Sequence, residues 1–483
     1  MKNALKFISY GCALSPALIS AGCGQQTASL NQSKPNIILC MADDQGWGDM
    51  GYNGHPVLKT PNFDNMSASA GIRFDRFYAA APLSSPTRGS VLTGRNPNRF
   101  GCFSFGQTLR PQEITVAEAL KTAGYVTAHF GKWHLGSVRA GSPVNPASSG
   151  FDEWLSSPNF FDNDPILSRE GKAVQTRGES SMVTADAAIE FMRKHSENKQ
   201  PFLAVVWFGS PHNPHIATGE ERQQYSDQPE NLQHYYGEIS GMDRAFGKLR
   251  QELKTLGISE NTILWYCSDN GGQTNKYSLT GGRGFKGQIW EGGLRVPAML
   301  EWPSRISQNR VSNIPCSTVD IYPTLLDIAG VKMDDQPVLD GVSILELIEN
   351  KMAKRIKPMG FWQWGPGKLV SSPKLMAALL EEQQKGISES DTSLLDLNAG
   401  KISIKYPDNN FPGHSAWLDW PYKLHRIQSK NDSVKYELYT LEKDASEEND
   451  LAGSDPKKAE TMKLQLDIWL KSVVNSLNGG DYN

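Results

Sequence analysis

The sequence predicts an α/β fold with a mixed, mostly parallel sheet and helices on both faces. Short apolar runs, helical patterns between them and a composition typical of globular proteins predict this fold class. Hydrophobic residues make up 39% and charged residues 21% of the 483-residue chain, which argues against wholesale disorder and against a fibrous fold. The 49 lysines and arginines face 52 aspartates and glutamates, so a net charge of −3 provides no basic field for nucleic acid.

Four short apolar runs are the expected strands of the sheet. They are rich in β-branched and aromatic residues and do not alternate with polar residues, which is typical of strands buried on both faces. The runs cover residues 36–42, 125–130, 202–208 and 262–268. Cys40 and Cys267 lie within two of these apolar runs and are therefore expected to be inert core residues. No CxxC spacing indicates a zinc site or a disulfide framework.

Helical patterns separate these runs. Residues 115–122 stop before Gly124, a residue typical of a C-terminal helix cap, and residues 184–194 carry apolar side chains on one face. The clearest apolar stripe ends at Gly257 and consists of Tyr235, Ile239, Met242, Phe246, Leu249 and Leu253. Strands that alternate with helices predict a largely parallel sheet between two helical layers.

The pattern changes near Gly360. Residues 422–427 and 436–439 alternate as antiparallel strands do, and residues 456–477 have the apolar side of a helix. We expect a small C-terminal antiparallel sheet with a packed terminal helix, and a polar surface insertion over 365–398 with a solvated helix face at 381–385. The expected organisation is an export signal at 1–23, a linker at 24–34, a main domain at 35–358 and a subdomain at 359–483.

The first 23 residues have the features of an export signal. Lys2 and Lys6 precede an apolar stretch, and small residues at 20–22 stand before Cys23, as at a cleavage site. This arrangement resembles a bacterial lipoprotein box and predicts a lipid anchor on Cys23, with an uncleaved N-terminal helix as the alternative. No later stretch reaches the roughly 18 apolar residues that cross a bilayer. The expected location is the periplasm or the outer membrane of a Gram-negative bacterium.

Two acidic loops directly follow predicted strands. Asp43 and Asp44 come after the first run, and Asp269 and Asn270 come after the run that ends at Ser268. In such sheets, ligands gather at the carboxyl ends of the strands. Three carboxylates and one amide supply only oxygen atoms, which Ca²⁺ or Mg²⁺ prefers. One such pair is often only a turn, but two pairs at equivalent strand ends predict a metal site.

The segment from Ser84 to Arg95 is a candidate anion site. By spacing alone, Ser84-x-Pro86-x-Arg88 is typical of a loop that enters a helix, with Ser84 or Ser85 capping the exposed amides. Alternatively, Arg88 lies one turn into such a helix and points its guanidinium beside Ser84, as an oxyanion site needs. The segment alone leaves both interpretations open.

Six motifs in order resemble those of the formylglycine-dependent type I sulfatases. The resemblance spans residues 35–330 and implies an alkaline-phosphatase-like α/β core with a small C-terminal subdomain. The motifs are Asp43-Asp44, Ser84-x-Pro86-x-Arg88 with Leu92-Thr93-Gly94-Arg95, Gly131-Lys132-Trp133-His134, Pro211-His212-x-Pro214, Asp269-Asn270-Gly271, and Lys286-Gly287 with Glu291-Gly292-Gly293-Leu294-Arg295-Val296-Pro297.

The resemblance implies the groups that the site would hold. Asp43, Asp44, Asp269 and Asn270 match calcium ligands, so Ca²⁺ is expected rather than Mg²⁺. Ser84 matches the residue that a maturation enzyme oxidises to formylglycine, whose hydrate supplies the nucleophile. Asp269 is also a candidate base for the attacking hydroxyl.

The resemblance also implies the residues that hold and cleave the ester. Arg88, Lys132 and Lys286 match the cations that bind the sulfate. His212 matches the residue that donates a proton to the leaving alcohol, and Lys286 is a candidate to assist it. His134 matches the base whose uptake of a proton releases the sulfate. Separately from the resemblance, His215 lies three residues after His212 and is expected to line the substrate site.

Ser84 departs from the family pattern, because most members carry cysteine there. Three explanations stay open: a serine-type enzyme matured by a radical oxidase, a Cys-to-Ser variant made to trap substrate, and a relative that uses unmodified serine. The second explanation would leave the chain as written inactive.

The function that the resemblance implies is hydrolysis of sulfate esters on a polysaccharide or its oligosaccharides, with a carrageenan-type galactan as the expected substrate. Candidate aromatic residues for stacking on sugars are Phe103, Phe105, Trp154, Phe160, Phe161, Trp362, Trp364, Trp417 and Trp420. One alternative is a phosphatase or phosphonate monoester hydrolase of the same fold, although the nine histidines include no Asp-His pair for a two-zinc site. The other alternative is a non-catalytic lipoprotein that binds sulfated glycans.

Overall fold

The computed structural model describes residues 34–482, apart from residues 70, 275 and 388–390. The predicted export signal and Cys23 lie outside the described residues. The described residues form one compact unit. None of the helices in the described part combines the length and the hydropathy that a membrane span requires.

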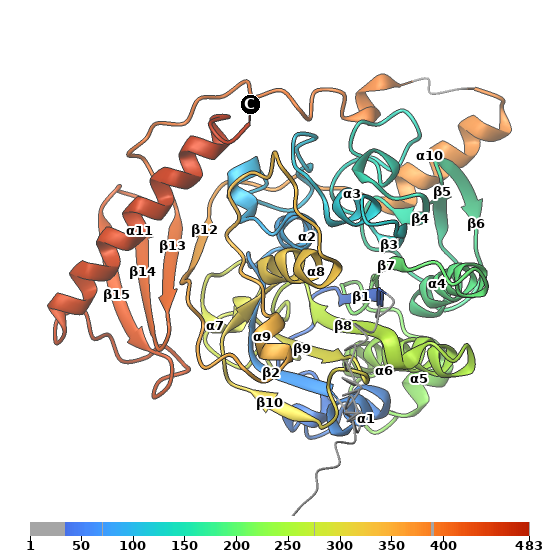
Figure 1. Ribbon diagram of the computed structural model, residues 1–483, viewed down its shortest axis with the longest axis horizontal. Helices are drawn as coiled ribbons and strands as arrows, with labels where there is room; N and C mark the ends of the chain where they lie inside the picture. Colours follow the sequence, from blue (N-terminus) through green and yellow to red (C-terminus); the bar gives the residue numbers. More distant parts are fainter. Residues whose placement is uncertain (1–33, 70, 275, 388–390, 483) are drawn as a thin grey trace, which may run out of the picture. The chain divides into compact units, whose positions relative to one another are not determined.

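A mixed, mostly parallel sheet forms the centre of the fold (Figure 1). Its strands in the described residues are β1 (Asn36–Ala42), β2 (Gly71–Tyr78), β3 (Val126–Lys132), β4 (Glu153–Ser157), β5 (Ile166–Arg169), β6 (Lys172–Gln175), β7 (Phe202–Trp207), β8 (Thr262–Ser268), β9 (Arg295–Glu301), β10 (Arg310–Ser312) and β11 (Cys316–Ser317). They run in the order β10-β2-β9-β8-β1-β7-β3-β4-β5-β6, and β11 pairs with β2. The central strands β8, β1, β7, β3 and β4 are parallel, which confirms the predicted sheet.

Helices cover both faces of this sheet. They are α1 (Pro61–Ala68), α2 (Ser84–Thr93), α3 (Val116–Lys121), α4 (Ser180–Glu197), α5 (Gly219–Gln223), α6 (Glu230–Thr255), α7 (Glu291–Leu294), α8 (Ile321–Ala329), α9 (Leu345–Ile348) and α10 (Ser372–Gln384). Ile37 and Leu39 of β1 belong to one core, with side chains of α2, α3 and α8. Ile38 and Cys40 belong to another core, with side chains of α1, α4 and α6. Successive residues of β1 are buried on opposite faces of the sheet. The sequence of this strand is therefore one continuous apolar run.

The segment over 365–398 is partly packed against the rest of the fold, whereas we expected a surface insertion. It contains α10, which buries Met376 and Leu379 in the first core. The predicted solvated helix face at 381–385 is confirmed, because these residues are exposed apart from Glu382, which is half-buried and pairs with Arg139 at 2.6 Å. One side of α10 is therefore packed against the rest of the fold. The sequence pattern did not indicate the burial of Met376 and Leu379, because most residues around them are polar.

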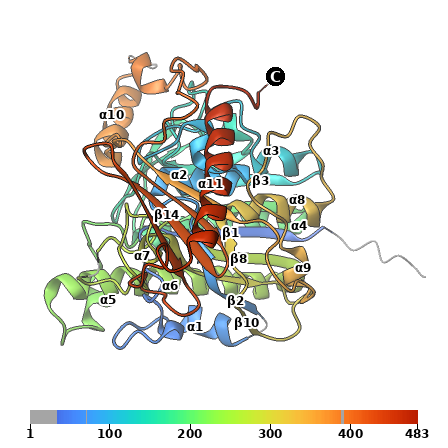
Figure 2. The ribbon, with the colours of Figure 1, turned by 90° about the vertical axis from the view of Figure 1, so that its left-hand side faces the viewer.

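A four-stranded antiparallel sheet follows, as predicted. Its strands are β12 (Met359–Gln363), β13 (His414–Asp419), β14 (Tyr422–Gln428) and β15 (Val434–Thr440). The terminal helix α11 (Pro456–Leu477) lies across this sheet (Figure 2). Trp469 and Val473 of the helix share a core with Leu424 and Leu438 of the strands.

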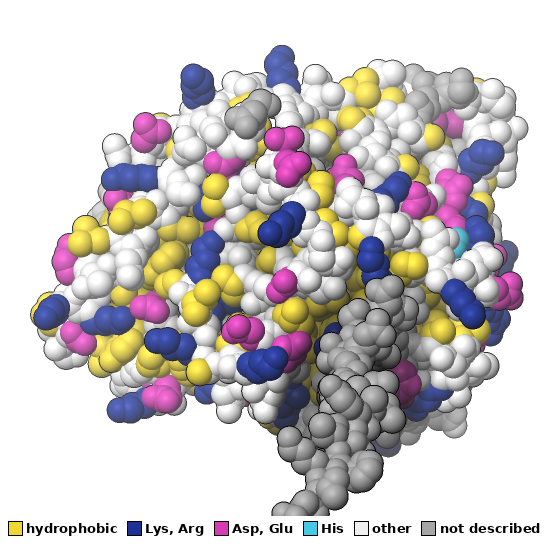
Figure 3. Space-filling model, viewed as in Figure 1, with side chains coloured by type: hydrophobic (Ala, Val, Ile, Leu, Met, Phe, Trp, Pro, Cys, Tyr) yellow, Lys and Arg dark blue, Asp and Glu magenta, His cyan; other side chains and the backbone are white. Residues whose placement is uncertain are grey.

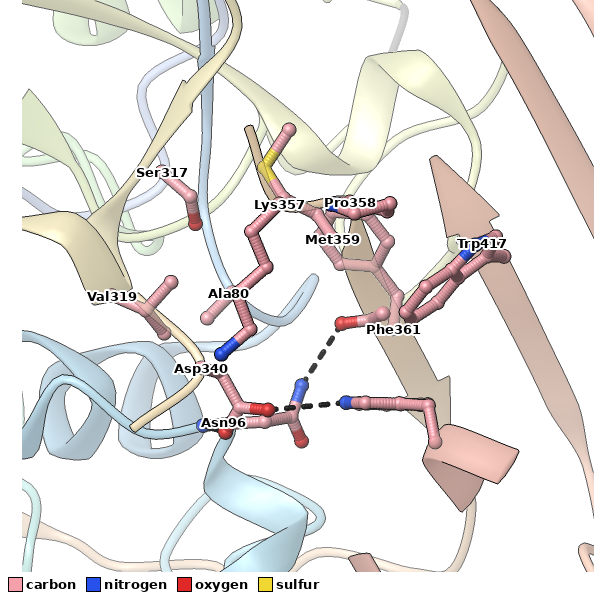
Figure 4. A pocket seen from close by; sticks show the side chains of 12 residues that line it. Ala80, Asn96, Ser317, Val319, Asp340, Lys357, Pro358, Met359, Phe361 and Trp417 are labelled. Atoms are coloured by element: carbon pink, nitrogen blue, oxygen red, sulfur yellow. Dashed lines mark hydrogen bonds between the residues drawn. The ribbon is translucent and has the colours of Figure 1, made fainter. Parts of the chain in front are cut away.

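Polar contacts join the two sheets around a cavity of about 30 Å³, which has room for little more than one water molecule (Figure 4). Asn96, which follows α2, donates its amide to the Gly360 carbonyl at 3.0 Å. Trp469 of α11 donates to Asp340 at 3.1 Å. Asp340 also pairs with Arg99 at 2.6 Å, so the segment after α2 is fixed to the small sheet and its helix.

The surface in Figure 3 has basic and acidic side chains intermingled. This distribution agrees with the near-zero net charge of the chain. An anionic ligand therefore has to be held by a local group of cations.

The half-buried ring of His55 gives a prediction about stability. Its Nδ1 atom accepts hydrogen bonds from the amides of Val57 at 3.1 Å and Leu58 at 2.8 Å. Burial lowers the pKa of His55 from 6.5 to about 4. Between these values the unfolded chain binds the proton more readily, so the free energy of unfolding should fall as the pH falls from 6.5 to 4.

Urea unfolding at pH 7 and pH 4.5 tests this prediction. After discounting for solvent screening, we expect His55 to account for about 1–2 kcal/mol of the acid-induced loss. The variant His55→Asn keeps an acceptor without the titration and should show a smaller loss. Equal losses in parent and variant would contradict the assignment.

Candidate active site

The carboxyl ends of β1 and β8 bring the four predicted metal ligands together. Ala42 lies opposite Ser268 in the parallel register, so Asp43 and Asp269 follow at one level. The Asp44 amide donates to Asp269 Oδ1 at 3.1 Å, and the Asn270 side chain donates to Asp44 Oδ1 at 2.9 Å. None of the four residues is more than 1% exposed. This buried set of oxygen donors fits a hard cation such as Ca²⁺.

Ser84 faces these ligands from the first turn of α2. Its Oγ atom lies 3.3 Å from Asp43 Oδ1 and 3.4 Å from Asn270 Oδ1. The helix has Leu83 at its N-cap position without a side-chain cap, and Ser85 Oγ accepts from the Gly106 amide at 2.8 Å. The interpretation of Ser84 or Ser85 as a helix cap is therefore wrong.

Three cations pair with the three carboxylates. Arg88 lies 2.7 Å from Asp269, and Lys132 lies 2.7 Å from Asp43. Lys286 lies 2.7 Å from Asp44. The Lys132 ammonium is also 3.4 Å from Ser84 Oγ. The positive charge expected to bind the sulfate thus surrounds position 84.

The cations keep the buried carboxylates ionised. Burial by itself would raise the pKa of Asp43, but Lys132 and His212 outweigh burial and hold this pKa below its ordinary value. Burial is likewise outweighed at Asp44 by Lys286, which lowers the pKa of that carboxyl. Both groups therefore carry negative charge at neutral pH.

His134 is the predicted base of the site. It follows β3, is 4% exposed, and neither ring nitrogen has a hydrogen-bond partner in the described residues. Its φ angle of 56° is uncommon for a residue other than glycine. Burial, together with Lys132 and Arg88, holds the pKa of His134 well below its ordinary value. The ring is therefore neutral and able to accept a proton.

His212 lies at the more open side, since 15% of its side chain is exposed. Its Nδ1 atom donates to the Asn213 carbonyl at 2.6 Å, and Nε2 lies 3.7 Å from Asp44 Oδ2. The Phe160 ring stacks on the imidazole at 4.1 Å. These contacts fix the orientation of the ring. We call the group Ser84, Arg88, Lys132, His134, His212 and Lys286 the anion pocket.

His215 is placed apart from these contacts. Its Nδ1 atom lies 3.6 Å from Glu238 Oε2 of α6, and its ring packs against Tyr235 and Tyr277. Its ring nitrogens have no hydrogen-bond partner in the part that the structure describes. The structure brings His215 next to an acid that the sequence analysis did not single out.

Comparison with known proteins identifies the family. The model of the Sulfatase family matches residues 35–331. The chain belongs to the sulfatase family. Its activity is therefore hydrolysis of sulfuric esters, and the predicted fold is confirmed by the similar structures below.

Named relatives cover most of this sulfatase. N-acetylgalactosamine-6-sulfatase of Mus musculus is 34% identical over 370 residues, 66% of this chain and 68% of the relative. The ulvan-active sulfatase of Formosa agariphila is 32% identical over 344 residues, 66% of either chain. The solved structure of Ps i-CgsB in complex with k-i-k-neocarrahexaose is similar with a TM-score of 0.75 and 25% identity, covering 90% of this chain and 93% of that chain.

A buried ion cluster of the sulfatase supports the loop that carries Lys286. Lys423 of β14 lies 3.0 Å from Glu291 and 3.0 Å from Glu447. The Glu447 carboxylate also accepts from the Glu291 amide at 2.7 Å, which fixes the start of α7. The sequence analysis missed Lys423 and Glu447, because no local pattern marks either residue.

The loop over residues 282–288 rests on this helix. The Gly292 amide donates to the Arg283 carbonyl at 2.7 Å, and the Gly287 amide donates to the Pro82 carbonyl at 2.8 Å. The ion cluster therefore connects, through α7, with the backbone on both sides of Lys286 and with the segment that precedes Ser84.

Asp49 has a similar supporting role at the loop that carries the predicted ligands Asp43 and Asp44. It accepts from the Gly46 amide at 2.9 Å and from the Leu279 amide at 2.8 Å. It also accepts from the Tyr235 hydroxyl at 2.6 Å. The only signal in the sequence is a third aspartate six residues after Asp43, which the sequence analysis did not use.

The ion cluster predicts a large effect of one substitution. Lys423→Met leaves Glu291 and Glu447 buried without their cation, so we expect the free energy of unfolding to fall by about 3–5 kcal/mol. Denaturant unfolding measures this loss. As a matched control, Lys458→Met breaks the more exposed pair with Asp419, which spans 3.3 Å, and should cost less than about 1 kcal/mol. Similar losses in the two variants would contradict the role of the cluster.

Proposed function

We propose that this sulfatase hydrolyses sulfate esters of a carbohydrate, a sulfated polysaccharide or the oligosaccharides derived from it. The observation that carries the proposal is the position of Ser84 Oγ, within 3.4 Å of Asp43, Asn270 and Lys132. The names of the relatives, which refer to N-acetylgalactosamine sulfate and ulvan, support a carbohydrate. The carrageenan oligosaccharide in the similar structure supports a carrageenan-type galactan as the first substrate to test.

Position 84 would carry the nucleophile after oxidation by a maturation enzyme to formylglycine. Asp43, Asp44, Asp269 and Asn270 would hold Ca²⁺, which supplies positive charge to activate the nucleophile and the ester. Arg88, Lys132 and Lys286 would bind the sulfate oxygens, where charge develops during transfer.

The two histidines divide the proton transfers. His212 lies at the open side and donates a proton to the alcohol oxygen as its bond to sulfur breaks. His134 is buried and neutral and accepts the proton whose removal lets sulfate leave residue 84. His215 would line the substrate site from its position beside Glu238.

We further propose that the protein is exported and resides in the periplasm or, through a lipid on Cys23, at the outer membrane of a Gram-negative bacterium. The charged start, apolar stretch and small residues before Cys23 support this location. A main domain over 35–358 and a subdomain over 359–483 remain the proposed boundaries.

Sulfate release should require the oxidation of residue 84 to an aldehyde. We expect Ser84 to become an aldehyde when the chain is coexpressed with a serine-type maturation enzyme, and Ser84→Cys to do so with a cysteine-type enzyme. Mass spectrometry of the peptide that contains residue 84 and sulfate release from an aryl sulfate measure the two events. An aryl phosphate should react at least about 100-fold more slowly. Aldehyde-bearing protein that releases no sulfate would refute the proposed function.

Metal removal should abolish the activity of the matured enzyme. We expect EGTA to lower kcat by about 100-fold or more, and Ca²⁺ to restore it better than Mg²⁺. Asp43→Asn should lower activity similarly without rescue by added Ca²⁺, whereas Asp186→Asn, at an exposed pair with Lys248, should behave as the parent. Full activity in EGTA would contradict the metal assignment.

A further inference from the structure

Residues 364–372, here called the rim segment, run from the end of β12 to the first residue of α10 and contact two loops near the anion pocket. On one side, the Lys368 amide donates to the Phe105 carbonyl at 2.8 Å. The next residue, Gly106, donates to Ser85 Oγ at 2.8 Å. The rim segment is therefore connected by two hydrogen bonds to the residue after Ser84.

On the other side, the rim segment contacts the loop that covers His212. Asn159 donates its side-chain amide to the Val370 carbonyl at 2.8 Å, and its backbone amide donates to Ser372 Oγ at 2.8 Å. The following residue, Phe160, stacks on His212 at 4.1 Å. One short segment thus connects the nucleophile side of the pocket with the side of the proton donor.

Three large side chains of the rim segment are exposed although its backbone is held by hydrogen bonds. Leu369 is 90% exposed and Trp364 is 37% exposed. The Trp364 ring stands nearly perpendicular to Phe103, at 88°, and to Tyr406, at 87°, so its orientation is held by packing. Lys368 is exposed and is the only charged residue in the segment.

We propose that the rim segment forms the subsite for the sugar residue next to the sulfated one, and that this neighbouring sugar carries an anionic group. Trp364 packs against the apolar face of the sugar ring, and Lys368 binds a sulfate or a carboxylate on it. This inference rests on the proposed function, because it places the sulfated residue in the anion pocket.

The geometry favours this position for the second sugar. Ser84, Arg88 and Lys132 are buried, with at most 1% exposure, so the remainder of the substrate has to leave on the side of His212, which is more open. On that side Phe160 stacks on His212, and the preceding residue, Asn159, contacts the rim segment. An exposed indole with a fixed orientation provides contact area at little conformational cost, and a nearby lysine adds preference for an anion.

The test compares small and extended substrates on the matured enzyme. Lys368→Ala and Lys368→Glu are surface changes that preserve the fold, and Trp364→Ala removes the aromatic ring. Lys374→Ala, at an exposed lysine of α10, is the matched control. Each variant is assayed with an aryl sulfate and with sulfated disaccharides whose second sugar is neutral, carries a carboxylate or carries a second sulfate.

We expect Lys368→Ala to raise KM roughly fivefold for the two disaccharides with an anionic neighbour, and Lys368→Glu to raise it further. KM for the aryl sulfate and for the neutral neighbour should change less than about twofold. Trp364→Ala should raise KM for every disaccharide by roughly tenfold and leave the aryl sulfate unaffected. The relative effects on the carboxylate and the second sulfate identify the anion.

Three results would overturn the inference. The first is a Lys368 variant that changes aryl sulfate and disaccharide hydrolysis equally, and the second is one that leaves the anionic disaccharides unaffected. The third is a parent enzyme that cleaves the aryl sulfate but none of the disaccharides. Failure of the aldehyde-bearing parent on every sulfate ester would instead refute the proposed function itself.

Discussion

Three buried carboxylates near Ser84 and the three cations that pair with them are stable in this fold only as a set. Each carboxylate has a cation at 2.7 Å, and Asp43, Asp269, Arg88 and Lys132 have no exposed side-chain surface. Loss of one partner leaves a buried charge uncompensated, which typically costs several kcal/mol. The order of the sheet makes the set possible, because β8, β1, β7 and β3 lie side by side and end at one edge. The residues that follow these strands therefore meet in one place.

The small antiparallel sheet helps to hold the charged residues around Ser84 in place. Lys423 holds Glu291 and Glu447, and α7 in turn supports the loop of Lys286. This support requires glycine at two positions. A Cβ atom on Gly292 would lie 2.2 Å from the Gly284 carbonyl oxygen, and one on Gly293 would lie 2.0 Å from the Gln288 carbonyl oxygen. The loop can lie directly on the helix only because neither position has a side chain.

The sequence predicted the features that have a local signature. Buried parallel strands such as β1 and β8 appear as apolar runs, and the long amphipathic α6 appears as a stripe. It did not predict β2, whose central residues include Arg73, Asp75 and Arg76, because a strand with half-buried charges forms no continuous apolar run in the sequence. Lys423 and Glu447 meet Glu291 only after folding, so their partnership has no local signal. His215 was predicted as a lining residue from its spacing to His212, but its neighbour Glu238 comes from a distant helix.

The burial and the backbone conformation of His134 help to distinguish an enzyme from a protein that only binds sulfated glycans. Its ring is buried with both nitrogens unpartnered, and its backbone has a φ angle of 56°. Each feature costs free energy in the folded protein without a ligand. Arg88, Lys132 and Lys286 already provide the charge that holds an anion, so simple binding gains little from an additional neutral base. A base, in contrast, has to be neutral and needs a ring nitrogen that is free to accept a proton. The free-energy cost of His134 therefore agrees better with an enzyme than with a protein that only binds anions.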